Sequence, residues 1–440
     1  MPAYAPVTLK RILGAPTAMC IGLGVAIGSG IFRTPGMVAG QLQSPALIVL
    51  AWIFGGVFAL MAGMVTAELA TRFARAGGEY VFLREAYGEF VAFFFGWAYT
   101  VFIIGGGAAS IASAFGDFGC ELMDLDRGWS RVLAGGAIVA VTGVNAVGLR
   151  TGAAAQNVLT CAKILSLIAI LVIGFAFAAQ PVDLAAPATD VAGRSWLAVF
   201  AAGVIPVLWA YDGTTDAVKM AEEIKDVRRA LPRALIASAL VLTVLYVLVN
   251  VALMRILSAD EMAGLDFVAG QAMHRVFGPS GRLAMLGVAM LVCLGSLSST
   301  VLATIRVTFA LARDGLAFRF MARMSKSQAP VPALVVVAAF SVMLVLARDF
   351  EQVIQIYFFA SAVLFGLSYA SLIVFRVRDR EFPAGAFRCP FGPLQATVLI
   401  LIQIALAIAI AMNNPRDAAY TAILLAAFGL LYVVWKRASV

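Results

Sequence analysis

Twelve apolar runs dominate this chain, and each is long enough to cross a lipid bilayer. Hydrophobic residues make up 62% of the 440 positions, only 13% are charged, and the mean hydropathy is +0.96. A soluble domain is nearer half apolar and a quarter charged, so this composition excludes a large soluble domain. In hydrocarbon every backbone polar group must be satisfied internally, and runs of about 20 apolar residues do so as helices. The sequence therefore predicts an all-α membrane protein.

The predicted spans follow one another with short connections. They are about Ile12–Gly36, Ala46–Ala70, Val81–Phe115, Arg131–Val147, Gln156–Ala179, Trp196–Met220, Leu231–Met254, Leu283–Ala312, Val331–Leu346, Val353–Phe375, Leu394–Met412 and Tyr420–Trp435. The mixed polar and apolar stretch Arg255–Arg282 is expected to form a surface helix in an outer loop.

The basic residues are distributed unequally between the two sides of these spans. With both termini in the cytoplasm, 22 of the 32 Lys and Arg residues fall on the inner side and 9 on the outer side, while Lys163 lies inside a span. This is the bias of the positive-inside rule. The sequence thus predicts a multi-pass protein of the plasma (inner) membrane, and the formal charge of +8 needs no nucleic-acid partner.

The first span carries a weak point at its centre. Two glycines flank a serine there, and glycine costs roughly 0.8–1.0 kcal/mol relative to alanine inside a helix. Such a sequence is either a helix break or a small-residue packing notch between helices. The residues concerned are Ala26, Ile27, Gly28, Ser29, Gly30 and Ile31.

A second weak point lies in the sixth span, where Pro206 precedes Trp209, Asp212 and Gly213. Breaks in spans one and six imply two five-helix halves, and five is odd, so the halves are inverted relative to each other. That pattern indicates a secondary transporter with its substrate site between the breaks. The prediction is one domain over 1–440, with repeats at about 12–179 and 196–375 and accessory helices at about 394–435.

Each break offers a different set of groups to a ligand. Amides of Ser29, Gly30 and Ile31 at a restarting helix suit a carboxylate, because this end is the positive end of the helix dipole. Carbonyls near Ala26 suit an ammonium group. In the sixth span, carbonyls near Trp209 and Asp212 extend that ammonium site, and the Trp209 ring is a candidate gate.

Two charged side chains inside spans have competing interpretations. The Asp212 carboxylate binds a cation or proton, or it caps the restarting half-helix, and the cap is the interpretation we favour. Lys163 either faces a functional interior, as costly intramembrane charges usually do, or snorkels to the cytoplasmic edge. We favour the functional interior, where an ammonium group replaces a bound sodium ion or cycles a proton.

The remaining polar residues suggest little further chemistry. Five acidic or basic residues near inner span ends are expected to form ion pairs at the interface: Glu68, Asp216, Lys219, Glu222 and Glu223. Neither a metal-ligand cluster nor a nucleophile motif stands out, so we expect no enzyme activity, metal or cofactor.

These motifs together resemble those of a known family, and the resemblance covers about Val7 to Arg437. The ordered motifs that carry the resemblance include Ile27–Phe32, Trp209–Gly213 and Ala312–Leu316. They are similar to those of the amino acid–polyamine–organocation (APC) transporters, and most like those of prokaryotic relatives of the L-type (LAT) amino acid transporters. The resemblance implies the inverted-repeat LeuT-like fold with twelve transmembrane helices, substrate held at both breaks, and Trp209 as the gate.

The resemblance also assigns Lys163 a role. It matches a lysine that occupies the place of a sodium ion, near Leu23 of the first span and Ser296 or Ser299 of the eighth, which implies sodium-independent transport. The chain departs from the family pattern at Thr214. In the family an aromatic residue often follows the Tyr-Asp-Gly motif, and here a threonine stands at that position. We expect no partner glycoprotein at Cys120, where animal L-type light chains carry a linking cysteine.

The sequence therefore predicts a sodium-independent transporter of L-amino acids, with neutral substrates and exchange favoured. The alternatives are proton-coupled symport, a cationic amino acid or polyamine carrier, and, in a different class, an ion channel.

Overall fold

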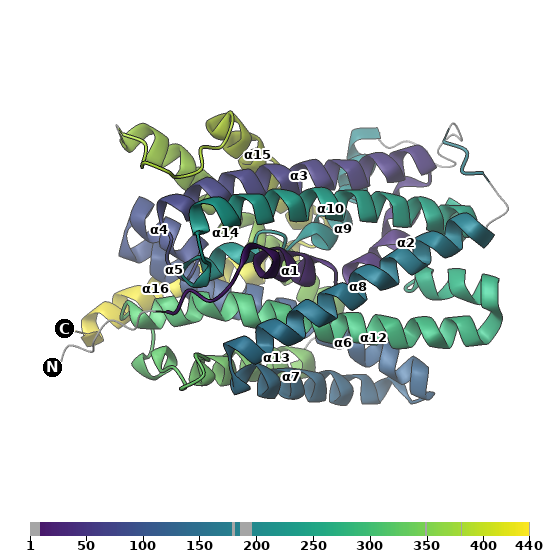
Figure 1. Cartoon of the computed structure of the whole chain (residues 1–440), viewed down its shortest axis with the longest axis horizontal. Coiled ribbons are helices and arrows are strands. Elements are labelled where there is room, and N and C mark those ends of the chain that lie inside the picture. The colour runs from purple at the N-terminus through teal and green to yellow at the C-terminus, as the bar shows by residue number, and fades with distance from the viewer. Residues whose placement is uncertain (1–8, 178–180, 185–195, 348–349, 380, 440) are drawn as a thin grey trace.

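A computed structural model describes residues 9–177, 181–184, 196–347, 350–379 and 381–439. These residues form an all-helical bundle whose helices run mostly along the long axis of the molecule (Figure 1). The first and last described segments of the chain lie at the same end of that axis (Figure 1). The predicted all-α membrane architecture is confirmed at this level.

The first half of the chain forms eight α-helices, one π-helix and one 3-10 helix up to residue 177, and α9 follows. They are α1 (Ala15–Ala26), α2 (Gly30–Leu42), α3 (Pro45–Arg72), α4 (Glu79–Tyr87), α5 (Glu89–Ala98), the π-helix η1 (Tyr99–Gly105), α6 (Gly106–Met123), η2 (Arg127–Trp129), α7 (Ser130–Val147), α8 (Leu149–Phe177) and α9 (Trp196–Tyr211). Proline in the first turn begins α1 and α3, where its missing amide costs nothing.

The second half of the described chain is also helical. It comprises η3 (Asp216–Glu223), α10 (Val227–Ile256), α11 (Ala259–Met262), α12 (Val268–Arg313), η4 (Arg319–Ala322), α13 (Val331–Ala347), α14 (Phe350–Arg378), α15 (Gly392–Asn413) and α16 (Pro415–Ser439).

Among the described residues, nine helical segments are long and apolar enough to cross a membrane, and the bent pair α1 and α2 makes a tenth. The helix α13 is a shorter apolar helix of 17 residues. The arrangement of twelve spans in two inverted halves stays a prediction.

Two predicted boundaries were wrong, and a glycine lies at each difference. The third span begins at Glu89 rather than at Val81, because Gly88 at φ +87° separates α4 from α5. The stretch Arg255–Arg282 is not one surface helix: it holds the end of α10, all of α11 and the start of α12, which bends at Gly278, where φ is +68°. Positive φ is readily available to glycine only, so these positions interrupt otherwise continuous apolar helices.

The half-helix α1 lies inside the bundle, packed against α8, α10 and α12. Its residues Ile21 and Leu23 are buried. The chain just before α1 is fixed as well, since the amides of Ile12 and Leu13 both donate to the Glu223 carbonyl at 3.0 Å. The start of the chain is thereby tied to the segment that follows the second break.

Candidate functional site: two broken helices around one cavity

The first predicted break is present. The helix α1 ends at Ala26, α2 begins at Gly30, and their axes differ by 47°. The first amides of α2 have no acceptor within their own helix, as at every helix N-terminus. The Ser29 hydroxyl beside them is 2% exposed and has no hydrogen-bond partner. This end of α2 therefore presents free donors inside the protein.

The last carbonyls of α1 are held by side chains from three other helices. Lys163 Nζ of α8 donates to the Gly24 carbonyl at 2.7 Å. The Tyr246 hydroxyl of α10 donates to the Ala26 carbonyl at 2.8 Å. In addition, the hydroxyl of Ser296 donates to the Val25 carbonyl at 2.8 Å. Remote donors thus satisfy the backbone that the break exposes.

Lys163 is fully buried, so its ammonium group does not snorkel to the membrane edge. It bonds one residue beyond the predicted Leu23, whose carbonyl instead accepts the Ile27 amide at 2.8 Å. The other predicted serine, Ser299, donates to the Gly295 carbonyl of its own helix at 2.7 Å. Lys163 and Ser296 therefore donate to two successive carbonyls at the first break, those of Gly24 and Val25.

The second break has a different construction. The helix α9 ends at Tyr211, a turn covers residues 212–215, and the chain continues as the 3-10 helix η3. Asp212 accepts hydrogen bonds from the Gly213 amide at 2.8 Å and from the Tyr357 hydroxyl of α14. Thr215 occupies the N-cap of η3 and makes no side-chain cap bond.

The favoured capping role of Asp212 was therefore wrong. Four turn residues separate α9 from η3, so Asp212 lies too early in the chain to reach the first amides of η3. Its carboxylate is bound instead by its neighbour and by a tyrosine from another helix.

The two breaks face each other across the centre of the bundle. A Cβ atom at Gly30 would lie 3.1 Å from Ala210 Cα and 3.2 Å from Trp209 Cδ1. A Cβ atom at Gly213, where φ is +89°, would overlap the side chain of Val25. A Cβ atom would thus be crowded at Gly30, and at Gly213 both the contact with Val25 and the positive φ favour glycine.

A cavity of about 50 Å³ lies between the breaks. It contains most of the predicted site: Ala26, Gly28, Ser29, Gly30, Trp209, Asp212, Gly213 and Ser296. Ile27 and Ile31 do not line it, and both are buried elsewhere in the core. Residues that sequence reasoning missed complete the wall: Tyr99, Ile103, Thr300, Thr304, Tyr357 and Phe365 among others.

Aromatic rings close one side of this cavity. The Trp209 ring packs edge-on against Tyr357 and Phe358, with centroids 4.9 and 5.5 Å apart. Tyr99 lies on the π-helix η1, a rare helical form that occurs often at functional sites. The apolar run alone did not predict that helix, because its sequence differs little from an ordinary α-helix.

The polar residues at the inner span ends do form ion pairs, as predicted, but most are buried in the protein rather than placed at an interface. Lys219 Nζ lies 2.5 Å from Asp216 and 3.3 Å from Glu79, and all three side chains are buried. Glu223 pairs with Arg306 at 2.9 Å. Because Asp216 also lines the cavity, the lysine cluster lies directly at its edge.

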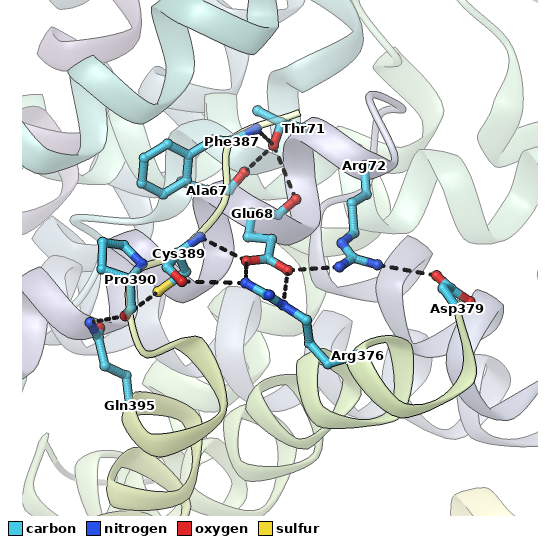
Figure 2. Close-up of polar contacts among 10 residues, drawn as sticks. All are labelled: Ala67, Glu68, Thr71, Arg72, Arg376, Asp379, Phe387, Cys389, Pro390 and Gln395. Carbon is cyan, nitrogen blue, oxygen red and sulfur yellow. Dashed lines mark hydrogen bonds and ion pairs between the residues drawn. The ribbon is translucent and has the colours of Figure 1, made fainter. Parts of the chain in front are cut away.

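Glu68 is the centre of another buried network, shown in Figure 2. Its two oxygens accept bonds from Arg376 at 2.8 and 2.6 Å, and Arg72 donates to one of them at 2.9 Å. The Cys389 amide adds a fourth bond at 2.7 Å. Removal of one partner from such a pair leaves a buried charge and costs about 3–5 kcal/mol. The network joins α3, α14 and the segment before α15.

Glu222 lies outside the spans and contacts three segments of the chain, those around Leu9, Ala76 and Arg313. It accepts hydrogen bonds from the Ala76 amide at 2.9 Å and the Leu9 amide at 3.3 Å, and it pairs with Arg313 at 2.9 Å. Burial raises the pKa of this carboxyl, but these donors and the arginine charge outweigh burial, so the pKa lies below its usual value. Glu222 is therefore ionised at neutral pH.

A cavity between two broken helices in a membrane bundle is the arrangement of a transporter. Among the residues that the structure describes, no group of three metal-ligating side chains lies together. The profile of the amino acid permease family matches residues 13–435. The chain belongs to that family, within the APC superfamily, and is a multi-pass membrane transporter rather than an enzyme.

Several curated proteins are similar along most of their length. The mouse (Mus musculus) b(0,+)-type amino acid transporter 1 is 27% identical over 433 residues, 97% of this chain and 88% of the relative. The serine/threonine exchanger SteT of Bacillus subtilis is 28% identical over 397 residues, 89% of each chain. The rabbit (Oryctolagus cuniculus) large neutral amino acids transporter small subunit 2 is 26% identical over 86% of this chain and 72% of the relative.

Proposed function

We propose that this protein exchanges L-amino acids across the membrane, without sodium, by alternating access to the cavity between the two breaks. Exchange is favoured because SteT, which is similar over 89% of its length, is a serine/threonine exchanger. In this mechanism an empty carrier reorients slowly, so a substrate on one side drives the return of a substrate from the other.

The groups common to all amino acids bind at the breaks. The carboxylate meets the amides of Ser29, Gly30 and Ile31 together with the free Ser29 hydroxyl. The ammonium group meets carbonyls near Ala26, Trp209 and Asp212. Closure of the Trp209 ring over the substrate completes the occluded state.

The bond from Lys163 Nζ to the Gly24 carbonyl is the observation that supports sodium independence. Broken-helix carriers coordinate sodium with carbonyls of this kind, and here a fixed ammonium group satisfies one of them. Uptake in sodium buffer and in choline buffer tests the point. Equal rates support the proposal, whereas a requirement for sodium contradicts it.

Neutral side chains are the proposed substrates, in keeping with the names of two relatives, the serine/threonine exchanger and the large neutral amino acids transporter. A second candidate, a cationic substrate, is favoured by one observation: the Asp212 carboxylate lines the cavity, and within the described part of the chain it forms no ion pair with a basic side chain. Competition by alanine, arginine and putrescine separates the two candidates.

Reconstitution into proteoliposomes tests the coupling. Uptake of labelled alanine that needs unlabelled amino acid inside the vesicle supports exchange. Uptake into empty vesicles driven by a pH gradient supports proton symport instead. Ion conduction without saturable, stereospecific uptake would indicate a channel and overturn the proposal.

We also propose that both termini face the cytoplasm, based on the excess of Lys and Arg at that side. The described ends of the chain lie at one end of the molecule, in agreement with an even number of crossings (Figure 1). A C-terminal fusion to alkaline phosphatase is expected to be inactive, and a fluorescent-protein fusion is expected to be bright.

A further inference from the structure

A second cavity lies directly behind the first. It has a volume of about 50 Å³ and is enclosed by α3, α9, α14, α15 and the turn at residues 212–215. Asp212 and Phe365 line both cavities, so these two side chains form the partition between them. The sequence analysis treated α15 as an accessory helix, yet α15 supplies part of this wall through Gln403 and Leu406.

Small side chains leave this space open. Thr214 of the turn and Ala59 and Ala62 of α3 all line the cavity and are buried. A bulkier side chain at Thr214 would occupy part of the volume that is empty here.

The chemistry of the wall favours a hydrogen-bond donor. Gln403 is 6% exposed, its side chain lies beside that of Tyr369, and its amide oxygen has no hydrogen-bond partner among the described residues. Buried polar groups are nearly always paired, and an unpaired acceptor is costly. The hydroxyls of Thr214 and Thr215 and the Asp212 carboxylate add further acceptors along the same wall.

We propose that this second cavity is a specificity subsite that receives the end of a long substrate side chain bearing N–H donors. The inference rests on the proposed amino acid transport. The substrate main chain stays at the breaks, its side chain passes between Asp212 and Phe365, and its terminal N–H group donates to Gln403. A short side chain such as that of alanine remains in the first cavity.

Two donor types share this chemistry, a neutral amide and a cationic ammonium group. Glutamine and lysine provide them, and norleucine has similar length without a donor. The experiment measures inhibition constants of alanine, norleucine, glutamine and lysine against labelled alanine uptake in proteoliposomes. Wild type is expected to bind glutamine, lysine or both more tightly than norleucine.

The decisive variant is Gln403→Met, which keeps the length of the side chain and removes the amide. Loss of one hydrogen bond is expected to weaken the preferred donor-bearing substrate roughly tenfold, with alanine and norleucine changed by less than about twofold. Ile404→Met, at the adjacent exposed position of α15, is the matched control and is expected to change nothing.

A second variant fills the cavity. Thr214→Leu is expected to weaken glutamine and lysine binding by roughly tenfold more than alanine binding. Equal inhibition constants for norleucine, glutamine and lysine in wild type, or unchanged selectivity in Gln403→Met, overturn the subsite and leave a cavity that holds only water. Wild type that takes up no amino acid, alanine included, overturns the proposed function itself.

Discussion

The two breaks differ in what stabilises them. In the first break, side chains from α8, α10 and α12 bond to three successive carbonyls of α1. In the second break, Asp212 bonds to its own neighbour Gly213, and a single remote hydroxyl, that of Tyr357, completes the contact. The turn of the first break is thus fixed by three other helices, whereas the carboxylate in the turn of the second break is bound by its own neighbour and by one tyrosine.

This difference suggests that the two breaks have different roles in transport. A segment held by several buried partners opens only at high free-energy cost, while a segment with few partners moves more readily. We therefore expect the first break to define binding of the substrate main chain. The second break is expected to control closure of the cavity and the choice of side chain.

The largest effect is expected at Gly30, where the breaks approach most closely. Gly30→Leu places side-chain atoms against Ala210 and Trp209 and is expected to lower alanine uptake by roughly a hundredfold or more. Uptake is compared with the elution profile of the purified protein. Gly136→Leu, where an added Cβ meets open space, is the control. Normal affinity in Gly30→Leu would contradict the site.

Lys163→Met keeps most of the stem and removes the ammonium group from the Gly24 carbonyl. A hydrogen bond to a charged group contributes about 1.5–3 kcal/mol, so turnover is expected to fall at least roughly tenfold. The measurement is the exchange rate between pH 5 and 8 in sodium-free buffer. Wild-type rates across that range would show that Lys163 serves packing alone.

Trp209→Ala removes the ring that packs against Tyr357 and Phe358. We expect turnover to fall by about tenfold through incomplete closure, since aromatic pairs contribute about 0.5–1.5 kcal/mol beyond their buried area. Trp129→Ala, at an exposed tryptophan outside the cavity, controls for general effects. Unaltered kinetics would remove the gate role from Trp209.

The smallest effects are expected from a matched pair, Tyr246→Phe and Tyr357→Phe, each of which removes one hydroxyl from one break. Tyr246→Phe is expected to weaken all substrates several-fold, because the Ala26 carbonyl loses its donor. Tyr357→Phe frees the Asp212 carboxylate and is expected to shift preference toward arginine over alanine. Identical selectivity in both variants would argue against different roles for the two breaks.

Several features of the site followed from the sequence because their causes are local. Two glycines beside Ser29 weaken a helix whatever surrounds it, and the chain bends there by 47°. An intramembrane lysine is costly wherever it occurs, and Lys163 is indeed buried at the first break. The reversed expectation for Asp212 shows the limit: a cap requires a helix start within reach, and the length of the turn was not visible in the sequence.

The sequence by itself determined the membrane class, the approximate spans and the positions of both breaks, because hydropathy and helix propensity depend on neighbouring residues. Only the tertiary structure decided which carbonyl Lys163 meets, that Tyr357 binds Asp212, and that Thr214 and Gln403 face one cavity. Those contacts join residues more than a hundred positions apart. Their partners are selected by how the helices pack, and no local pattern encodes that choice.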